Sequence, residues 1–184
     1  MKKVLVPLAP GFEEIEAITV IDVLRRAGVE VVVAGTQPGP IEASRQTKHI
    51  PDCTLDDVRA EDFDMIVLPG GQPGTTNLRH DARIRQIIEI LRGTDRRIAA
   101  ICAAPSVLSA YGVLQGRAAT SHPSVRAEVA AGAREYSEQR VVVDGPIVTS
   151  QAAGTAMEFA FTLVEILCGA EKAAKVNRGV LARR

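Results

Sequence analysis

Short apolar runs alternate with amphipathic segments along this chain, and the first such unit limits the possible folds most. Val4–Leu8 is an apolar run, Val29–Ala34 is a second run rich in β-branched residues, and Glu13–Ala27 lies between them. The middle segment has isoleucine or leucine at helical spacing and stops at a glycine (Ile15, Ile18, Ile21, Leu24 and Gly28). A strand, a helix and a strand in one sheet need a crossover connection, so the sequence predicts parallel strands.

The same alternation continues to the end of the chain. Further strands are predicted over Met65–Leu68, Arg97–Ile101, Ala118–Ser121 and Ile147–Ser150, and helices over Ala82–Leu91, Ser106–Ala110, Ser124–Ala131, Thr155–Leu167 and Ala170–Val176. Two small hairpins are expected, one pairing Ile41–Ser44 with Lys48–Ile50 and one pairing Tyr136–Ser137 with Val141–Val143, followed by a turn at Asp144–Gly145. With no repeat or linker, the sequence predicts one α/β domain over residues 1–184, a doubly wound, mostly parallel sheet with helices on both faces.

Composition excludes several classes of partner. Lys plus Arg and Asp plus Glu both total 22 in 184 residues, so the net charge is zero and nothing favours sequence-specific nucleic acid or an anionic membrane. No apolar run reaches the ~18 residues of a membrane span. The first residues enter an apolar strand without a signal pattern, so we expect a cytoplasmic protein. Three cysteines predict no disulfide framework.

Cys102 is the strongest candidate for chemistry. It follows the predicted strand Arg97–Ile101 and precedes a helical pattern of small residues, so we expect one thiol at a strand tip and at a helix N-terminus. The unpaired N–H groups and partial positive charge there favour a thiolate, which is the nucleophilic form. The sequence therefore predicts a pKa for Cys102 well below that of a free thiol.

Other candidate residues also follow predicted strands, at the sheet edge where doubly wound folds place their sites. A nucleophile needs a proton acceptor and donors for a developing oxyanion. Glu16 and His122 are the acid–base candidates, and the N–H groups of Gly71 and Ala103 are the candidate oxyanion donors. Glu16 is expected to point inward with its apolar neighbours Ile15 and Ile18, where burial beside a thiolate would raise its pKa.

Simpler interpretations stay open at this point. Cys102 alone is compatible with a small buried hydrophobe, Glu16 with a favourable charge in a first helical turn, and His122 with a helix cap. Pro69–Gly70–Gly71 is compatible with an ordinary turn. No glycine-rich phosphate-binding motif and no cysteine–histidine zinc spacing is present, so no metal site is predicted.

Several stretches, in order along the whole chain, resemble the DJ-1/PfpI superfamily and, more narrowly, its DJ-1 branch. They are Gly11–Glu16, Val23–Gly28, Val67–Gly71, Ala99–Pro105 and Thr149–Thr155. The resemblance implies a flavodoxin-like sandwich and a homodimer. It implies that Cys102 is the reactive cysteine, that protonated Glu16 donates a hydrogen bond to its sulfur, and that the pocket includes His122, Gly70, Arg26 and Arg45.

The resemblance also implies an activity that requires no cofactor. Cys102 would attack glyoxal, methylglyoxal or an early glycation adduct on protein or nucleotide, as in glyoxalase III or deglycase chemistry. The alternative is an oxidative-stress sensor or redox-regulated chaperone, in which Cys102 oxidises to a sulfinic acid. A peptidase or amidotransferase-like module, which needs an oriented cysteine–histidine pair, and a nucleotide-binding domain are weaker alternatives. Gln72–Pro73 and Gln151–Ala153 depart from the family pattern at the pocket rim.

Overall fold

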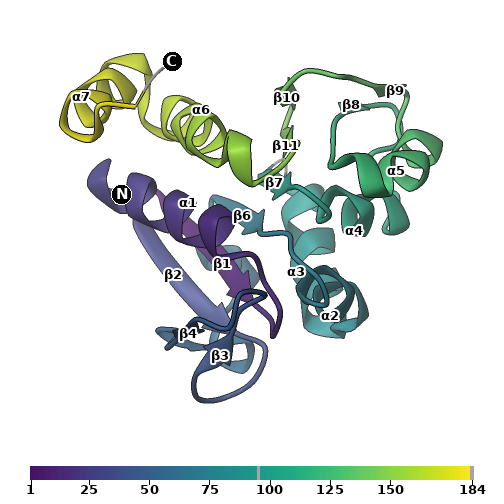
Figure 1. Ribbon diagram of the computed structural model, residues 1–184, viewed down its shortest axis with the longest axis horizontal. Coiled ribbons are helices and arrows are strands. Elements are labelled where there is room, and N and C mark those ends of the chain that lie inside the picture. Colours follow the sequence, from purple (N-terminus) through teal and green to yellow (C-terminus); the bar gives the residue numbers. More distant parts are fainter. Residues whose placement is uncertain (95, 183–184) are drawn as a thin grey trace.

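The computed structural model describes residues 1–94 and 96–182. Within these ranges seven strands form one sheet in the order β10-β11-β7-β6-β1-β2-β5 (Figure 1). Adjacent strands are parallel except for β10, which is antiparallel to β11. The strands are β1 (Lys3–Leu8), β2 (Glu30–Gly35), β5 (Cys53–Thr54), β6 (Met65–Leu68), β7 (Arg97–Ile101), β10 (Val141–Asp144) and β11 (Ile147–Ser150). The predicted doubly wound, mostly parallel sheet is confirmed.

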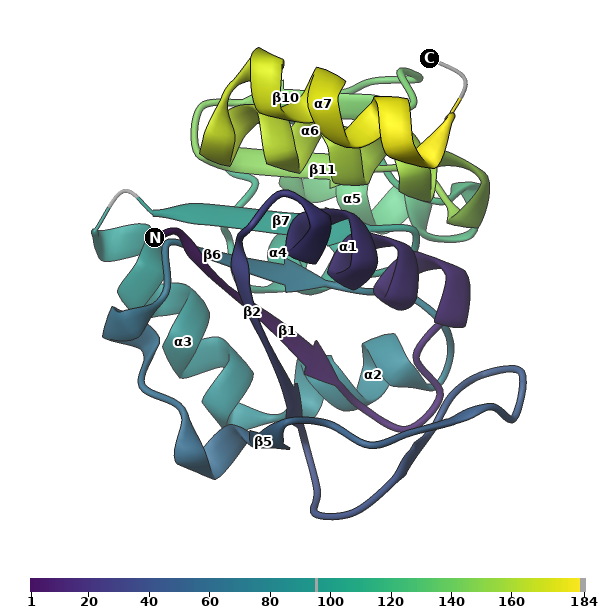
Figure 2. The same cartoon turned by 90° about the vertical axis from the view of Figure 1, so that its left-hand side faces the viewer.

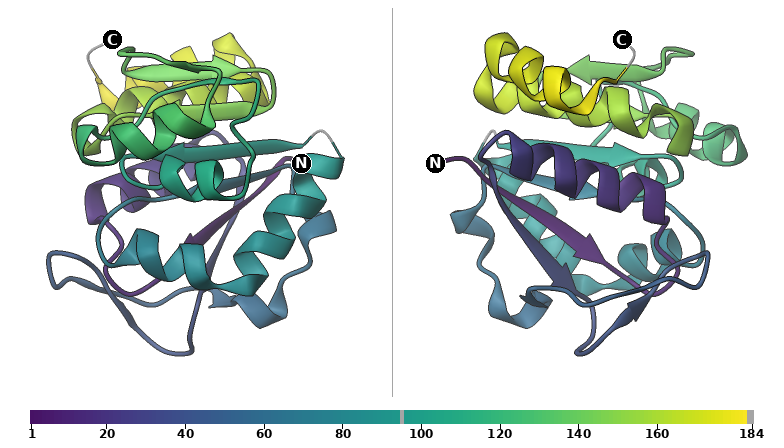
Figure 3. Two further views of the ribbon diagram at one scale, coloured as in Figure 1. Left: turned by 90° about the vertical axis from the view of Figure 1, so that its right-hand side faces the viewer. Right: turned by 60° about the vertical axis from the view of Figure 1, so that its left-hand side comes forward.

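Helices cover both faces of this sheet, as predicted. On one face lie α1 (Glu14–Arg26), α6 (Ala156–Cys168) and α7 (Ala170–Val180) (Figure 2). On the other lie α2 (Gly74–His80), α3 (Ala82–Gly93) and α4 (Pro105–Ala110), with α5 (Arg126–Gly132) packed on α4 (Figure 3). Short 3-10 turns complete the helical segments: η1 (Leu55–Asp57), η2 (Ala60–Asp62), η3 (Pro123–Val125) and η4 (Ala153–Thr155).

The core has two layers because successive strand residues point to opposite faces. In β1, Val4 and Val6 join the cluster beneath α1 and α6, whereas Leu5 joins the cluster beneath α3. Both faces of the central strands are buried, so these strands are apolar throughout, as is typical of parallel sheets. No helix in residues 1–94 or 96–182 is long and apolar enough to cross a bilayer.

The two predicted hairpins have different outcomes. Strands β3 (Ile41–Glu42) and β4 (Lys48–His49) form the first, antiparallel as expected. The second prediction is wrong, because β9 (Glu135–Tyr136) pairs in parallel with β8 (Ala118–Ala119). Strand β10 instead turns directly into β11, with Asp144 opposite Ile147. Gly145, at φ 59°, permits this two-residue connection, so the tight turn selected the pairing.

Two further details of the helices differ from the prediction. Helix α2 was not predicted, because its Gly-Thr-Thr-Asn start has low helix propensity and Leu78 is its one large apolar residue. The inward stripe of α1 was misassigned at its start. Ile15 and Ile18 are 55% and 37% exposed, and the buried face is made by Ala17, Val20, Ile21, Val23 and Leu24 together with Glu16.

Candidate functional site

Cys102 lies at a sharp turn between strand β7 and helix α4, as its sequence context predicts. Strand β7 ends at Ile101 and α4 begins at Pro105. Cys102 has a φ of 64°, the left-handed conformation that costs a non-glycine residue roughly 1–3 kcal/mol. Such a conformation persists only when its surroundings hold it.

Two main-chain hydrogen bonds hold the Cys102 backbone. Its N–H donates to the carbonyl of Ser150 at the end of β11 (2.9 Å), and its carbonyl accepts from the N–H of His122 (2.8 Å). Segments distant in sequence therefore fix the turn from both sides. The thiol is left half-buried at the carboxyl edge of the sheet.

Glu16 is a buried carboxyl in the first turn of α1, with 1% of its surface exposed. Helix α1 begins here because the side chain of Glu13 accepts from the N–H of Glu16 (2.9 Å). The N–H of Gly70, just after β6, donates to Oε2 of Glu16 (2.8 Å). Its other oxygen, Oε1, has no nitrogen or oxygen donor among the described residues. The thiol of Cys102 lies close enough to this carboxyl to lower its pKa, against the larger effect of burial.

Gly70 shows how closely Glu16 and Cys102 approach each other. A Cβ atom built on Gly70 would lie 2.6 Å from Oε2 of Glu16 and 2.7 Å from Cβ of Cys102. The space between the carboxyl and the cysteine is therefore filled by a residue without a side chain. This close approach, and not a positive φ, explains glycine at position 70.

The two predicted oxyanion donors surround the sulfur. The N–H groups of Gly71 and Ala103 both face the thiol, and each lowers the pKa of Cys102. Gly71 has a φ of 90°, and a Cβ there would lie 2.5 Å from the nitrogen of Glu13. Two amide donors and one carboxyl thus meet at one sulfur atom.

The electrostatics of the pair agree with one prediction and contradict another. Burial raises the pKa of Glu16 to about 7, against hydrogen bonds from Cys102 and Gly70 that lower it. The expected low pKa of Cys102 is wrong. Burial, followed by the charge of Glu16, raises the pKa of this thiol to about 12, because together they outweigh the two amide donors. A single negative charge, on the carboxyl, is therefore favoured over two charges when Glu16 is ionised.

The remaining predicted residues lie further from the sulfur or act through other atoms. The ring of His122 contacts Ser124, with Nδ1 2.8 Å from the Ser124 hydroxyl, so the structure links His122 to Cys102 through its main-chain N–H. Arg26 pairs with Asp22 at the far end of α1, about 15 Å along the helix from Glu16 of the same chain.

Arg45 lies in the loop between β3 and β4. Its N–H donates to Oε1 of Glu14 (2.8 Å), which joins this loop to the start of α1. The same carboxylate accepts from the hydroxyls of Ser44 and Thr47. These bonds lower the pKa of Glu14, although burial opposes them. Arg45 therefore lies beside the first turn of α1, which carries Glu16.

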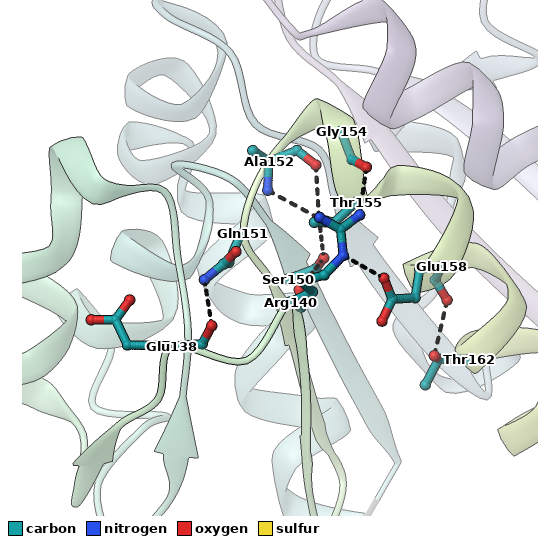
Figure 4. A network of polar contacts seen from close by, with 9 residues as sticks. All are labelled: Glu138, Arg140, Ser150, Gln151, Ala152, Gly154, Thr155, Glu158 and Thr162. Carbon is teal, nitrogen blue, oxygen red and sulfur yellow. Dashed lines mark hydrogen bonds and ion pairs between the residues drawn. The ribbon is translucent and has the colours of Figure 1, made fainter. Parts of the chain in front are cut away.

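A second group of residues next to Cys102 was not assigned any role from the sequence. Ser150 and Thr155 are 0% and 3% exposed, and their hydroxyl oxygens lie 2.6 Å apart (Figure 4). The available signal was a hydroxyl residue at the end of the strand Ile147–Ser150 and another in the turn that follows. Buried hydroxyls are costly unless paired, so they mark a specific arrangement.

Comparisons with known proteins agree with this geometry. A family model described as the DJ-1/PfpI family matches residues 2–166. Parkinson disease protein 7 homolog of Danio rerio is 40% identical over 185 residues, covering 99% of this chain and 98% of that protein. Glutathione-independent glyoxalase DJR-1.2 of Caenorhabditis elegans is 38% identical over 172 residues, covering 93% and 91%. The solved structure of oxidized Toxoplasma gondii DJ-1 has a TM-score of 0.96 at 39% identity, covering 100% of both chains.

Proposed function

Because this chain belongs to the DJ-1/PfpI family, we propose that it is a cysteine-dependent enzyme that acts on reactive carbonyl compounds without a cofactor. The small substrates are glyoxal and methylglyoxal, and the larger ones are early glycation adducts on protein or nucleotide. A relative 38% identical to this chain is named a glutathione-independent glyoxalase, which supports this reaction class.

The observation that carries the proposal is the meeting of Cys102 and Glu16 across Gly70. A thiol, a carboxyl whose pKa is about 7 and two main-chain N–H donors share one half-buried site. A carboxyl with a pKa near the working pH both gives and takes protons efficiently. The site therefore combines a nucleophile, an acid–base group and oxyanion donors.

The first step is proton transfer within the pair. When Glu16 is ionised and Cys102 is a thiol, moving the thiol proton to Glu16 leaves the negative charge on sulfur. The N–H groups of Gly71 and Ala103 and the O–H of neutral Glu16 then stabilise the thiolate. Catalysis requires only that the minor form, with a Cys102 thiolate and a neutral Glu16, be populated, since only this form reacts with the substrate.

The thiolate then attacks the aldehyde carbon of methylglyoxal, and a C–S bond forms while the carbonyl oxygen takes a proton from Glu16. Glu16 next removes the hydrogen from this carbon and returns a proton to the neighbouring ketone carbon, while the hydroxyl proton of the hemithioacetal passes to the ketone oxygen. The former aldehyde carbon is thereby oxidised to a thioester, and the ketone carbon is reduced to an alcohol. Water cleaves the thioester, which releases lactate and restores the thiol, so no external oxidant or reductant is consumed.

His122 contributes to this site through its main chain in our proposal. Its N–H holds the carbonyl of Cys102, whereas its ring binds Ser124. We therefore expect His122→Ala to keep lactate formation within about threefold of the parent, since a general base contributes typically 10²–10⁴-fold. A loss in that larger range would instead assign the ring to proton transfer.

The direct test is turnover of methylglyoxal by the purified protein. We expect lactate to form with the parent and not with Cys102→Ser, and Glu16→Gln to reduce kcat by at least about 100-fold. Cys53→Ser is the matched control, because it alters another half-buried free cysteine away from this site. Equal lactate formation by the parent and Cys102→Ser would reject the proposal.

Oxidation of Cys102 is a second candidate function, favoured by the resemblance to a structure described as oxidized DJ-1. In this role hydrogen peroxide transfers oxygen to the thiolate and is reduced to water, and two such steps give a sulfinate. The N–H groups of Gly71 and Ala103 and a protonated Glu16 are suited to bind its oxygens. Peptide mass spectrometry after mild peroxide should show two added oxygen atoms on Cys102 before any on Cys53 or Cys168.

We also infer that the chain forms a homodimer through the exposed face of α1. Ile15, Ile18 and Met157 are apolar, partly or largely exposed, and line one open groove of about 450 Å³. Ile50, next to the β3–β4 hairpin, is 82% exposed. Contiguous exposed apolar surface of this kind is typical of a protein interface.

A further inference from the structure

Two buried hydroxyl groups, those of Ser150 and Thr155, lie next to the Cys102 turn. The Ser150 hydroxyl donates to the carbonyl of Arg140 (2.9 Å) and lies 2.6 Å from Oγ1 of Thr155. Oγ1 of Thr155 in turn accepts from the N–H of Ala152 (3.1 Å) and donates to the Ala152 carbonyl (2.8 Å). These contacts connect Ala152, Thr155, Ser150 and Arg140 in one polar cluster (Figure 4).

These hydroxyl groups are connected to the Cys102 turn through the main chain of Ser150. The Ser150 carbonyl accepts the N–H of Cys102, one of the two bonds that hold its left-handed conformation. Ser150 is the last residue of β11, where its backbone pairs with Ile101 of β7 and Val141 of β10. Its side chain adds two contacts at this strand end, with the Thr155 hydroxyl and with the Arg140 carbonyl.

Arg140 fixes the outer end of the same arrangement. Its Nε donates to Oε2 of Glu158 (2.7 Å) and its Nη2 to the carbonyl of Gly154 (2.8 Å), which joins the start of β10 to η4 and α6 (Figure 4). The N–H of Gln151 also donates to the Arg140 carbonyl (3.2 Å). The hydroxyl pair thus lies between the start of β10, the end of β11 and η4.

We propose that Ser150 and Thr155 are positioning residues of the thiol site, because their buried hydroxyl pair fixes the carbonyl that holds Cys102 in its left-handed conformation. They touch neither substrate nor sulfur in this role. Their effect is to set where Sγ lies relative to Glu16 and to the N–H groups of Gly71 and Ala103. The inference rests on the proposed role of Cys102 as the nucleophile.

The test compares two substitutions of Thr155 with one of Thr162. Thr155→Val removes the hydroxyl at nearly constant volume, and Thr155→Ser keeps it. Thr162→Val is the matched control, since the Thr162 hydroxyl donates to the Glu158 carbonyl on the same helix, away from Cys102. The readouts are methylglyoxal turnover and the pH dependence of iodoacetamide alkylation, followed at the Cys102 peptide by mass spectrometry.

We expect Thr155→Val to lower kcat about tenfold with KM within about twofold, and to shift the pH midpoint of alkylation, because misplacement of a reacting atom costs rate more than binding. Thr155→Ser and Thr162→Val should match the parent in both readouts. A parent-like kcat and alkylation profile in Thr155→Val overturns the inference, and so does an equal loss in Thr162→Val. If Thr155→Val does not fold, Ser150→Ala decides by the same criteria.

The two readouts separate this inference from the proposed function. If the parent makes no lactate but Thr155→Val still changes Cys102 alkylation, the proposed enzyme is wrong and the positioning role holds. If the parent makes lactate and Thr155→Val alkylates and turns over as the parent does, only the positioning role is overturned.

Discussion

At the scale of single residues, the site depends on a buried carboxyl and a half-buried thiol that compete for one proton. Glu16 is almost fully buried and receives one N–H bond, from Gly70, on one of its two oxygens. Its pKa is raised from 4.5 to about 7, so the folded protein binds a proton that the unfolded chain releases between these values. The same group therefore links activity to stability.

Stability should fall as pH rises through this interval. Below pH 4.5 Glu16 is neutral in both states, and above about pH 7 it is charged in both, so the folded state loses roughly 3 kcal/mol between them. Urea unfolding of the parent and of Glu16→Gln from pH 4.5 to pH 8 measures this. We expect the parent to lose stability relative to Glu16→Gln as pH rises, and a constant difference between the two would contradict the buried, titrating carboxyl.

Gly70 gives a second prediction at this scale. A methyl group there would overlap Oε2 of Glu16 and Cβ of Cys102, so Gly70→Ala must push the pair apart. We expect methylglyoxal turnover to fall by about 100-fold or more, since catalytic geometry tolerates little displacement. Gly93→Ala is the matched control, because nothing lies within 4 Å of a Cβ at Gly93 in α3. Parent-like turnover in Gly70→Ala would show that the approach is not tight.

At the scale of elements, the joint between β7 and α4 stores strain at Cys102. Its φ of 64° is a conformation that glycine adopts freely and that a residue with a Cβ adopts at a cost. Cys102 keeps this conformation because its N–H donates to Ser150 of β11 and its carbonyl accepts from the N–H of His122. The thiol is therefore presented at the sheet edge at the expense of local stability.

Substitution at this joint should reverse the usual order of alanine and glycine. We expect Cys102→Gly to be more stable than Cys102→Ala by about 1 kcal/mol in thermal or urea unfolding. In the control pair, Ala130→Gly should destabilise the parent by about 1 kcal/mol, because Ala130 lies exposed within the regular helix α5. If Cys102→Ala is the more stable of the two, the left-handed conformation is not a strained one.

At the scale of the whole molecule, the outer face of α1 exposes two isoleucines beside its polar and charged residues. Ile15 and Ile18 were expected inside and are exposed. Together with Met157 of α6, these isoleucines form an exposed apolar patch that a partner chain would bury. This is the face on which we expect the homodimer to form.

The oligomeric state tests this surface. We expect light scattering to give twice the 19.6 kDa chain mass for the parent and the chain mass for Ile18→Glu. Val143→Glu is the matched control, because Val143 is 50% exposed on the edge strand β10 and lies outside the groove. A parent of 19.6 kDa, or a dimer that survives Ile18→Glu, would contradict the predicted interface.

Sequence reasoning reached much of this architecture because its strongest signals are local. The apolar runs Met65–Leu68 and Arg97–Ile101 form β6 and β7 as predicted, and each ends where a candidate site residue follows. The side of α1 on which each residue lies was harder to predict from the sequence, because Ile15 and Glu16 are adjacent and either one fits an inward position. Packing against α6 and the sheet decided that Glu16, and not Ile15, is buried.

The sequence by itself determined the order of elements, the parallel sheet and the strand ends that carry Cys102, Gly70 and Gly71, because periodicity and glycine act over a few residues. Only the tertiary structure decided how these groups affect one another. Burial raises the pKa of both Glu16 and Cys102, and the carbonyl that holds Cys102 comes from Ser150, 48 positions away in the printed numbering. Desolvation and contacts between distant segments exist only once the chain is folded.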